Sequence, residues 1–380
     1  MSRWPGKYVI GLTGSIGTGK SVVRRMLEHL GAYGIDADAL AHRAMAKGAP
    51  GYDPILRAFG RFLLTPEEQI DRARLGRLVF NDPDALAVLE HILHPLVLQA
   101  VDLLVKRAPH KVVVIEAIKL FETDLVNMCD SLWVVYAPHE VQLSRLMQHR
   151  KMSEVEARQR ISAQPPQETR FDRASVIIKN IASFEETWQQ VTAAWQRLVP
   201  VKAVGAFPVS QPVKLPLGEV NVQRAGPRQV EEIVRVYHQA DAGNTSVDSN
   251  AIMAAFGDKA FLLLKIENRT MGVLGWQVEN LVARTTEILL DPNVPAAQYL
   301  PILIREMEQA STQLQCEISL IYVPPHLARY DSLWISLGYA EKKPDDLNVL
   351  AWKEAALESM QPDSILFVKP LRQDRVLRPI

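Results

Sequence analysis

The sequence predicts an α/β protein in which a parallel sheet with flanking helices and a lid is followed by a second, α+β domain. Three observations support this prediction. Short apolar segments alternate with helical segments through the first half of the chain. A proline-rich stretch then interrupts the alternation. The length of 380 residues also exceeds what one hydrophobic core usually serves.

Four apolar segments are expected to form the strands of the first sheet. They are continuous rather than alternating, which is typical of strands covered on both faces. They are "YVIGL" (8–12), "VVVIE" (112–116), "LWVVYA" (132–137) and "SVIIKN" (175–180). Between the first two, "SVVRRMLEHL" (21–30) predicts a helix that ends at Gly31, since glycine favours helix C-termini.

The first domain is expected to span residues 1–198 and the second residues 219–380, with an extended linker at 199–218. Proline fixes φ and removes a backbone donor, so the prolines of this stretch favour a linker. They are Pro200, Pro208, Pro212 and Pro216. The α+β prediction comes from a strand and helix at 219–240, a hairpin at "KIENRTMG" (265–272), a helix at 299–312 and a strand at 316–323.

Composition argues against several classes of protein. Lysine plus arginine equals aspartate plus glutamate at 43 each, and this zero net charge disfavours a nucleic-acid partner. Two cysteines, Cys129 and Cys316, are too few for a disulfide framework or a zinc site. No run approaches the roughly twenty apolar residues that span a bilayer, and no signal peptide is evident. We therefore expect a cytoplasmic protein without a membrane partner.

The stretch "GLTGSIGTGKS" (11–21) predicts a phosphate-binding loop. Glycines in a strand–loop–helix setting let successive amides converge on one anion at a helix N-terminus. Lys20 would then reach the β- and γ-phosphates, and Ser21 would place its hydroxyl on Mg²⁺. The alternative is a flexible glycine turn. We expect a bound nucleoside triphosphate.

Two aspartates in "GIDADALAHR" (34–43) are candidates for the chemistry of this site. Asp36 and Asp38 are one strand period apart and can share a face. Asp38 is either the N-cap of the next helix or a carboxylate facing the phosphate loop at the edge of the sheet where ligands bind. The residues alone leave both readings open.

Arginines cluster after the third of the four segments listed above. They are Arg145, Arg150, Arg158 and Arg160. One reading is a solvated pair of amphipathic helices. The other is a mobile lid that brings guanidinium groups onto transferring phosphates.

Residues 7–198 resemble the dephospho-coenzyme A kinase family. The resemblance is carried by "GLTGSIGTGKS", "IDADALAHR", "GYDPILRAFG", "IDRARLGRLVFNDPDALAVLEHILHPLV", "LFE", "CDSLWVV", "QLSRLMQHR" and "RISAQ". It implies a P-loop kinase fold with core, acceptor-binding and lid parts. It also implies that ATP, with Mg²⁺, phosphorylates the ribose 3'-hydroxyl of dephospho-coenzyme A, the last step of coenzyme A synthesis.

The resemblance assigns roles to residues of this chain. Asp38 would accept or orient the proton of the 3'-hydroxyl, and Arg145 would be the lid arginine, followed by Arg150. Asp36, Arg72 and His94 fall in stretches associated with the acceptor, although His94 precedes Pro95 and could instead be an ordinary helix-end residue. The residues expected to bind ATP are Gly14, Gly17, Thr18, Gly19, Lys20, Ser21, Val22 and Arg150.

The chain departs from the family pattern at four positions. In "EAIKLFE", Ile118 replaces the usual proline and Lys119 a leucine. Ser175 stands where an aspartate is usual, and Ala182 where a glycine is usual beside the adenine region. The phosphate loop, Asp38 and Arg145 are kept, so we expect activity to be retained. Two other readings stay open: a different small-molecule P-loop kinase, and a nucleotide-binding regulator whose kinase half has decayed.

Residues 219–380 resemble the GNAT acyltransferase fold by the arrangement of their elements. The best local likeness is "ARYDSLWISLGYAEKK" (328–343). No glycine lies between Asp291 and Leu303, where that fold has a pyrophosphate loop. We therefore expect a degenerate, structural or regulatory domain with Tyr330 and Tyr339 in its core. An acyl-CoA or a protein remains open as its partner.

Overall fold

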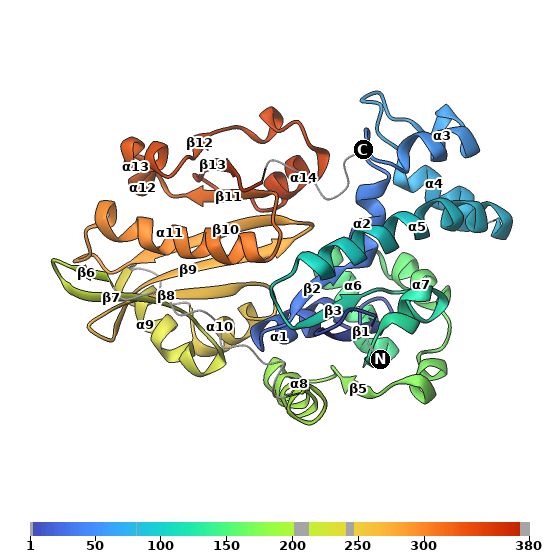
Figure 1. Cartoon of the computed structure of the whole chain (residues 1–380), viewed down its shortest axis with the longest axis horizontal. Helices are drawn as coiled ribbons and strands as arrows, with labels where there is room; N and C mark the ends of the chain where they lie inside the picture. Colours follow the sequence, from blue (N-terminus) through green and yellow to red (C-terminus); the bar gives the residue numbers. More distant parts are fainter. Residues whose placement is uncertain (1–2, 81, 201–212, 241–246, 373–380) are drawn as a thin grey trace. The chain divides into compact units, whose positions relative to one another are not determined.

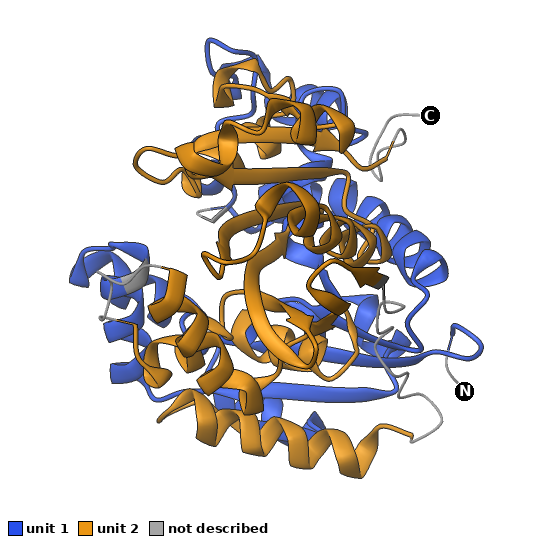
Figure 2. Ribbon diagram, turned by 90° about the vertical axis from the view of Figure 1, so that its left-hand side faces the viewer, with its two compact units in different colours: residues 1–20, 34–177, 374–380 blue, residues 21–33, 178–373 orange. Residues whose placement is uncertain are grey.

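The computed structural model describes residues 3–80, 82–200, 213–240 and 247–372 (Figure 1). The chain forms two compact units, one of residues 1–20, 34–177 and 374–380, the other of residues 21–33 and 178–373 (Figure 2). The domain boundaries expected from the sequence stay a prediction, because most of the proposed linker, residues 201–212 with Pro208 and Pro212, lies outside the described residues.

A five-stranded sheet carries the first part of the chain, in the order β2-β3-β1-β4-β5. Strand β1 lies in its centre and pairs in parallel with β3 and β4, as the continuous apolar runs predict. The strands are β1 (Tyr8–Gly14), β2 (Tyr33–Asp36), β3 (Val112–Glu116), β4 (Ser131–Tyr136) and β5 (Val176–Lys179). Since β1 and β3 are buried along nearly their whole length, helices must cover both faces of the sheet centre.

Helices follow the strands in the expected alternation. They are α1 (Lys20–His29), α2 (Ala37–Ala44), α3 (Tyr52–Phe59), α4 (Arg72–Phe80), α5 (Pro83–Arg107), α6 (His139–Arg150), α7 (Glu154–Ser162) and α8 (Phe184–Leu198). Gly31 follows the end of α1 with φ of 104°, a left-handed conformation that glycine adopts at little cost.

Helix α5 corrects two expectations from the sequence. It runs for 25 residues with Pro95 inside it, so His94 is not at a helix end. Its most apolar window has a mean hydropathy of 1.5, so the expectation that no segment is long and apolar enough to span a membrane is wrong by length and composition. Core helices pass the same test, and Leu93 of α5 packs in a cluster with Ala44 and Ile55 of α2 and α3.

The second unit contains an eight-stranded sheet in the order β12-β13-β11-β10-β9-β8-β7-β6. Its pairs are antiparallel except β10 with β11, which are parallel. The strands are β6 (Val213–Leu215), β7 (Gly218–Arg224), β8 (Ala260–Ile266), β9 (Arg269–Glu279), β10 (Val282–Leu290), β11 (Ile318–Val323), β12 (Ala340–Glu341) and β13 (Ile365–Pro370). The expected hairpin joins β8 to β9 through Glu267 and Asn268, both at positive φ.

Helices from Val230 onward interleave with the strands of this sheet. They are α9 (Val230–Ala240), α10 (Ser249–Ala255), α11 (Ala296–Gln313), α12 (Pro325–Ala328), α13 (Asp331–Ser336) and α14 (Leu350–Glu358). Tyr339 is buried in the core and donates a hydrogen bond to the Ser319 hydroxyl at 2.9 Å, while Tyr330 packs against the same core. Tyr339 therefore has the core position that the sequence predicts, whereas Tyr330 is only partly buried beside the core. The α/β plus α+β fold class is confirmed.

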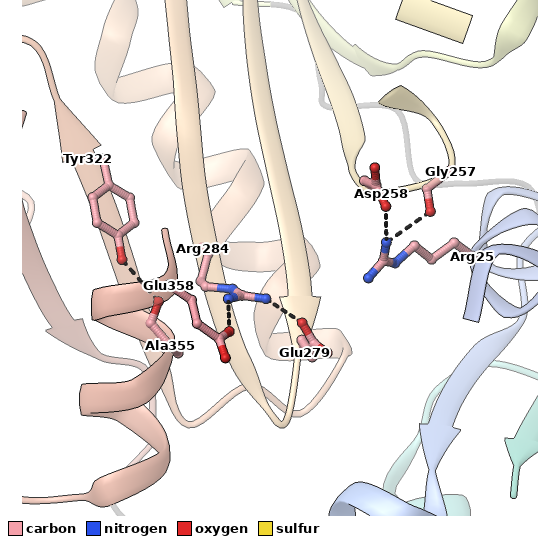
Figure 3. Close-up of polar contacts among 8 residues, drawn as sticks. All are labelled: Arg25, Gly257, Asp258, Glu279, Arg284, Tyr322, Ala355 and Glu358. Carbon is pink, nitrogen blue, oxygen red and sulfur yellow. Dashed lines mark hydrogen bonds and ion pairs between the residues drawn. The ribbon is translucent and has the colours of Figure 1, made fainter. Parts of the chain in front are cut away.

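Helix α14 is tied to the sheet by a buried arginine (Figure 3). Arg284 of β10 pairs with Glu279 of β9 and, at 3.0 Å, with Glu358 of α14. The Tyr322 hydroxyl on β11 donates to the carbonyl oxygens of Ala355 and Ala356 at 3.3 and 2.9 Å. A guanidinium this deeply buried needs such charged partners, and Arg284 thereby joins β9, β10 and α14.

Helix α1, which follows the phosphate loop directly, belongs to the second unit by its contacts. Arg25 donates to the Gly257 carbonyl oxygen at 2.9 Å (Figure 3). His29 Nε2 lies 3.1 Å from the Phe256 carbonyl oxygen. The His29 ring packs edge-on against the rings of Phe256 and Trp188. The turn after α10 and helix α8 thus both pack on α1.

Candidate functional site

The predicted phosphate loop lies between β1, which ends at Gly14, and α1, which begins at Lys20. Gly17 and Gly19 have φ of 74° and 88°, so this backbone favours glycine. The Thr18 hydroxyl donates to the Ser15 carbonyl oxygen at 2.8 Å and closes the turn. The loop therefore has the strand–loop–helix geometry of an anion site.

Lys20 is buried and donates to the Ser15 carbonyl oxygen at 3.3 Å. Burial lowers the pKa of Lys20, while the negative charges of Glu116, Asp38 and, more weakly, Asp36 raise it. The lysine that the motif assigns to the phosphates thus lies within electrostatic reach of both predicted aspartates.

Three side chains from the lid region contact the phosphate loop. Arg145 of α6 donates to the carbonyl oxygens of Gly17 and Thr18 at 3.5 and 3.3 Å, and burial lowers its pKa. Arg170 is buried and donates to the Ser15 hydroxyl at 3.1 Å. Gln164 accepts from the Ile16 amide at 2.8 Å. The structure therefore brings Arg145 to the loop as predicted and adds Arg170 and Gln164, to which the sequence analysis assigned no role.

The two aspartates separate into different environments. Asp36 is the N-cap of α2, because its carboxylate accepts from the Ala39 amide at 2.8 Å. The reading in which Asp38 is the N-cap is therefore wrong. Asp38 lies in the first turn of α2 and accepts from the Ile118 amide at 3.0 Å.

Asp38 has a raised pKa. Burial is the main cause, opposed by the Ile118 amide and the charge on Lys20, while Glu116 pushes the pKa further up. A carboxylate with a raised pKa is a stronger base than an exposed one, which suits proton abstraction near neutral pH.

A cavity of about 190 Å³ lies beside Asp38, between α2, α5 and the segment after β3. Its polar lining includes Asp38, His94, Glu90 and Lys119, and its apolar lining includes Leu93. The structure thus brings His94 and Asp38, 56 positions apart in the sequence, to one cavity. Mostly apolar walls with a few polar groups are typical of small-molecule sites.

Asp36, Arg72 and Arg150 lie outside this cavity lining. Arg72 is an exposed residue at the start of α4. The pKa of His42 is lowered mainly by burial and further by the charge of Arg72. Arg150 is exposed at the end of α6, and its charge acts on Lys20. The structure does not bring Arg72 together with Asp38 and His94.

Glu116 is a site residue that the sequence analysis missed. It ends β3, is buried, and its charge acts on both Lys20 and Asp38. The available signal is that Glu116 is the charged residue in "VVVIE", at the end of a strand beside the phosphate-loop strand. Ligands of open α/β sheets bind at that edge.

The arginines of α7 lie on a solvated helix surface, as the first of the two interpretations predicts. Arg158 and Arg160 each pair one turn back, at 2.8 Å, with Glu154 and Glu156. All four side chains are about half exposed, so these pairs belong to a solvated helix surface.

The polar departures from the family pattern have partners. Lys119 forms an ion pair with Glu90 at 2.6 Å beside the cavity. Ser175 donates its amide to the Leu132 carbonyl oxygen at 2.7 Å, and its hydroxyl oxygen accepts from the Leu132 amide at 3.0 Å. Each polar residue is therefore accommodated locally.

Comparisons with known proteins find one family for the first half of the chain. The family model described as dephospho-CoA kinase matches residues 8–186. The dephospho-CoA kinase of Moorella thermoacetica is 43% identical over 195 residues, covering 50% of this chain and 92% of that protein.

Two solved structures are similar to separate parts of the chain. Dephospho-CoA kinase from Campylobacter jejuni is 32% identical with a TM-score of 0.38, covering 50% of this chain and 97% of that one. PaiA N-acetyltransferase from Thermoplasma acidophilum, in complex with coenzyme A, is 12% identical with a TM-score of 0.31, covering 40% of this chain and 98% of that one. ATP binding, and a kinase role in coenzyme A biosynthesis, follow from the matches of the first half. Through that half, the chain belongs to the dephospho-CoA kinase family.

Proposed function

We propose that the first half of this chain transfers the γ-phosphoryl group of ATP to the ribose 3'-hydroxyl of dephospho-coenzyme A, giving coenzyme A and ADP. The observation that carries this proposal is the place of Asp38. Its carboxylate lines a cavity of about 190 Å³ and lies within electrostatic reach of Lys20. A base beside an acceptor cavity and near a phosphate-binding lysine is the arrangement that phosphoryl transfer to an alcohol needs.

In this proposal Asp38 acts on the acceptor. The 3'-hydroxyl proton passes to the Asp38 carboxylate, the hydroxyl oxygen forms a bond to the γ-phosphorus, and the bond from that phosphorus to the β,γ-bridging oxygen breaks. ADP leaves with the electron pair of that bond. Raising the pKa of Asp38 by burial brings it closer to the range in which a carboxylate is an effective base.

The phosphates of ATP are held by the loop at the start of α1. The residues we assign to this role are Gly14, Gly17, Thr18, Gly19, Lys20, Ser21 and Val22. Arg145 contacts the same loop through two carbonyl oxygens and would supply positive charge to the migrating phosphoryl group. Arg150 adds a second positive charge on the same helix.

The acceptor is assigned to the cavity beside Asp38. His94 lines that cavity and can donate a hydrogen bond to the ligand, while Leu93 contributes apolar surface. Asp36 shapes the site by capping α2. Arg72 lies outside the lining, so a contact with dephospho-coenzyme A would be made beyond the cavity.

Magnesium fits the donor set at the phosphate loop. Mg²⁺ prefers oxygen ligands and keeps several waters, so one protein hydroxyl and substrate phosphates suffice. Among the described residues, no group of three or more His, Cys, Asp or Glu side chains could form a dedicated metal site. Ser21, in the first turn of α1, is the residue that would hold the ion. The bound ion would neutralise charge on the phosphates.

The test is ATP-dependent formation of ADP with dephospho-coenzyme A as acceptor, with the 3'-phosphorylated product identified by mass spectrometry. A panel of nucleosides and nucleotides serves as control acceptors. Dephospho-coenzyme A is expected to give the highest kcat/KM by at least about tenfold. A faster reaction with a nucleoside or nucleotide, or ATP binding without any ADP formation, would overturn the proposal.

A further inference from the structure

The short segment after β3 is bonded to the strand that leads into the phosphate loop. The Ala117 amide donates to the Leu12 carbonyl oxygen of β1 at 3.0 Å. One residue further along each of these two segments, the Thr13 hydroxyl donates to the Ile118 carbonyl oxygen, also at 3.0 Å. Thr13 is fully buried and directly precedes Gly14. Ala117 and Ile118 are therefore held in register with the start of the phosphate loop.

The same segment also holds Asp38. The Ile118 amide donates to Asp38 Oδ2 at 3.0 Å. In the described part of the chain no hydrogen bond reaches Asp38 Oδ1, while the residue itself lines the acceptor cavity. One carboxylate oxygen is thus fixed by the protein, and a carboxylate has acceptor capacity left for a substrate hydroxyl.

Ile118 can donate this bond because it has an amide hydrogen. Proline has no amide hydrogen and could not donate the bond to Asp38. The bond therefore excludes proline at position 118 while other side chains would keep it.

We propose that Ile118 is a positioning residue, whose amide links the phosphate loop to Asp38 through β1 and sets the orientation of that carboxylate toward the acceptor hydroxyl. The inference rests on the proposed function. Hydrogen bonds of 3.0 Å from Thr13 to residue 118 and from residue 118 to Asp38 fix the base relative to the phosphate loop. Such alignment contributes strongly to phosphoryl transfer.

The charges of Lys20, Glu116 and Lys119 act on Asp38 besides the Ile118 amide. The titratable side chains of His94, Glu90 and Asp124 line the same cavity. None of these is altered by a change at residue 118. A shift of the pH profile in a residue-118 variant therefore reports the loss of the amide.

The experiment compares two pairs of full-length variants. Ile118→Pro removes the amide hydrogen, whereas Ile118→Val keeps it with a similar β-branched side chain. Thr13→Val removes the hydroxyl that holds the Ile118 carbonyl oxygen, whereas Thr13→Ser keeps a hydroxyl. For each variant, kcat/KM for dephospho-coenzyme A is measured against pH, together with ATP affinity as a check of folding.

Ile118→Pro is expected to lower kcat/KM about tenfold, because a hydrogen bond to a charged group is lost. The acid limb of its pH profile should also move up by about one unit, because the amide favours the ionised carboxylate. Thr13→Val should also lower kcat/KM and move the acid limb up, in each case by a smaller amount than Ile118→Pro. Ile118→Val and Thr13→Ser should retain the original profile.

The two proposals fail in different ways. If the unaltered chain does not phosphorylate dephospho-coenzyme A, the proposed function fails. If it does, and Ile118→Pro binds ATP normally with an unchanged pH profile, the positioning role of Ile118 is overturned. Should Ile118→Pro not fold, an unchanged profile in Thr13→Val overturns it instead.

Discussion

Arg25 of α1 and Asp258, which follows α10, form an ion pair at 3.1 Å although 233 positions separate them (Figure 3). The Arg25 side chain is mostly buried and also donates to the Gly257 carbonyl oxygen. The helix that starts at the phosphate-binding lysine thus depends on residues from the last third of the chain.

Replacing Arg25 by alanine should destabilise the protein. The variant loses a hydrogen bond and an ion pair, so the free energy of unfolding should fall by about 1–2 kcal/mol. Urea unfolding followed by fluorescence measures this change in the free energy of unfolding. Arg197→Ala, which removes an exposed arginine from α8, is the control and should change stability by less than about 0.5 kcal/mol. Equal effects of both substitutions would contradict a role for the Arg25 contacts.

Acidification should destabilise the packing around His29. Burial lowers the pKa of His29 from 6.5 to about 3, so the unfolded chain binds a proton that the folded chain does not. The free energy of unfolding is therefore unaffected by this group above pH 6.5, and it falls as the pH drops below 6.5. Between pH 7.5 and 5.5 the loss should be about 1 kcal/mol. His29→Gln should unfold with a flatter dependence on pH, and an equally steep dependence would show that other groups are responsible.

Asp38→Asn should abolish most of the kinase activity while keeping ATP binding. Loss of a general base typically lowers kcat by 10²- to 10⁴-fold. In the unaltered chain, activity should fall as pH drops through the pKa of Asp38, which burial raises above 3.8. Coupled ADP assays and ATP titrations measure the two properties. A variant that keeps more than about a tenth of the activity would exclude Asp38 as the base.

Gly17→Ala should weaken ATP binding. The new Cβ would lie 3.0 Å from the Gln142 carbonyl oxygen, at a φ of 74° that alanine rarely adopts. We expect the KM for ATP to rise about tenfold, from strain of 1–2 kcal/mol in the loop. Gly48→Ala is a matched control, because Gly48 has φ of 77° but nothing within 4 Å of the added carbon. A similar rise in KM in both variants would refute a specific role for the loop geometry.

Two variants of Asp36 separate capping from acceptor binding. Asp36→Ser keeps an oxygen that can cap α2, whereas Asp36→Ala does not. If Asp36 acts as a cap, alanine should cost about 1 kcal/mol of stability and serine much less. If Asp36 also binds the acceptor, as the family resemblance implies, serine should still raise the KM for dephospho-coenzyme A. Thermal unfolding and acceptor kinetics on both variants decide between the two.

Periodicity and turn chemistry predicted much of the fold. The apolar run at 112–116 forms β3 with the expected bounds, and the polar turn at Glu267 and Asn268 forms the expected hairpin. These features depend on short-range pattern, which a sequence displays directly. The boundary of α2 was harder, because Asp36 and Asp38 are both acceptable caps and only the backbone shows which one accepts from an amide.

Side-chain identity carries part of the signal for the candidate site. Lys20 and Arg145 lie at the phosphate loop, and Asp38 and His94 line the cavity, while their roles stay predictions. The hydrogen bond from the Ile118 amide to Asp38 could not be predicted from side-chain identity. Every residue except proline has a backbone donor, and the sequence does not indicate which acceptor it binds. Contacts such as Arg25 with Asp258 join distant segments and leave no local pattern.

The contacts of α1 have a consequence for the order of synthesis. A ribosome completes β1, the phosphate loop and α1 more than two hundred residues before it reaches Phe256 and Asp258. Until then, Arg25 and His29 lack those partners. Helix α1 therefore reaches its final packing only after translation has passed α10, when β6 and β7 of the second sheet have been made, and not when the five-stranded sheet is complete.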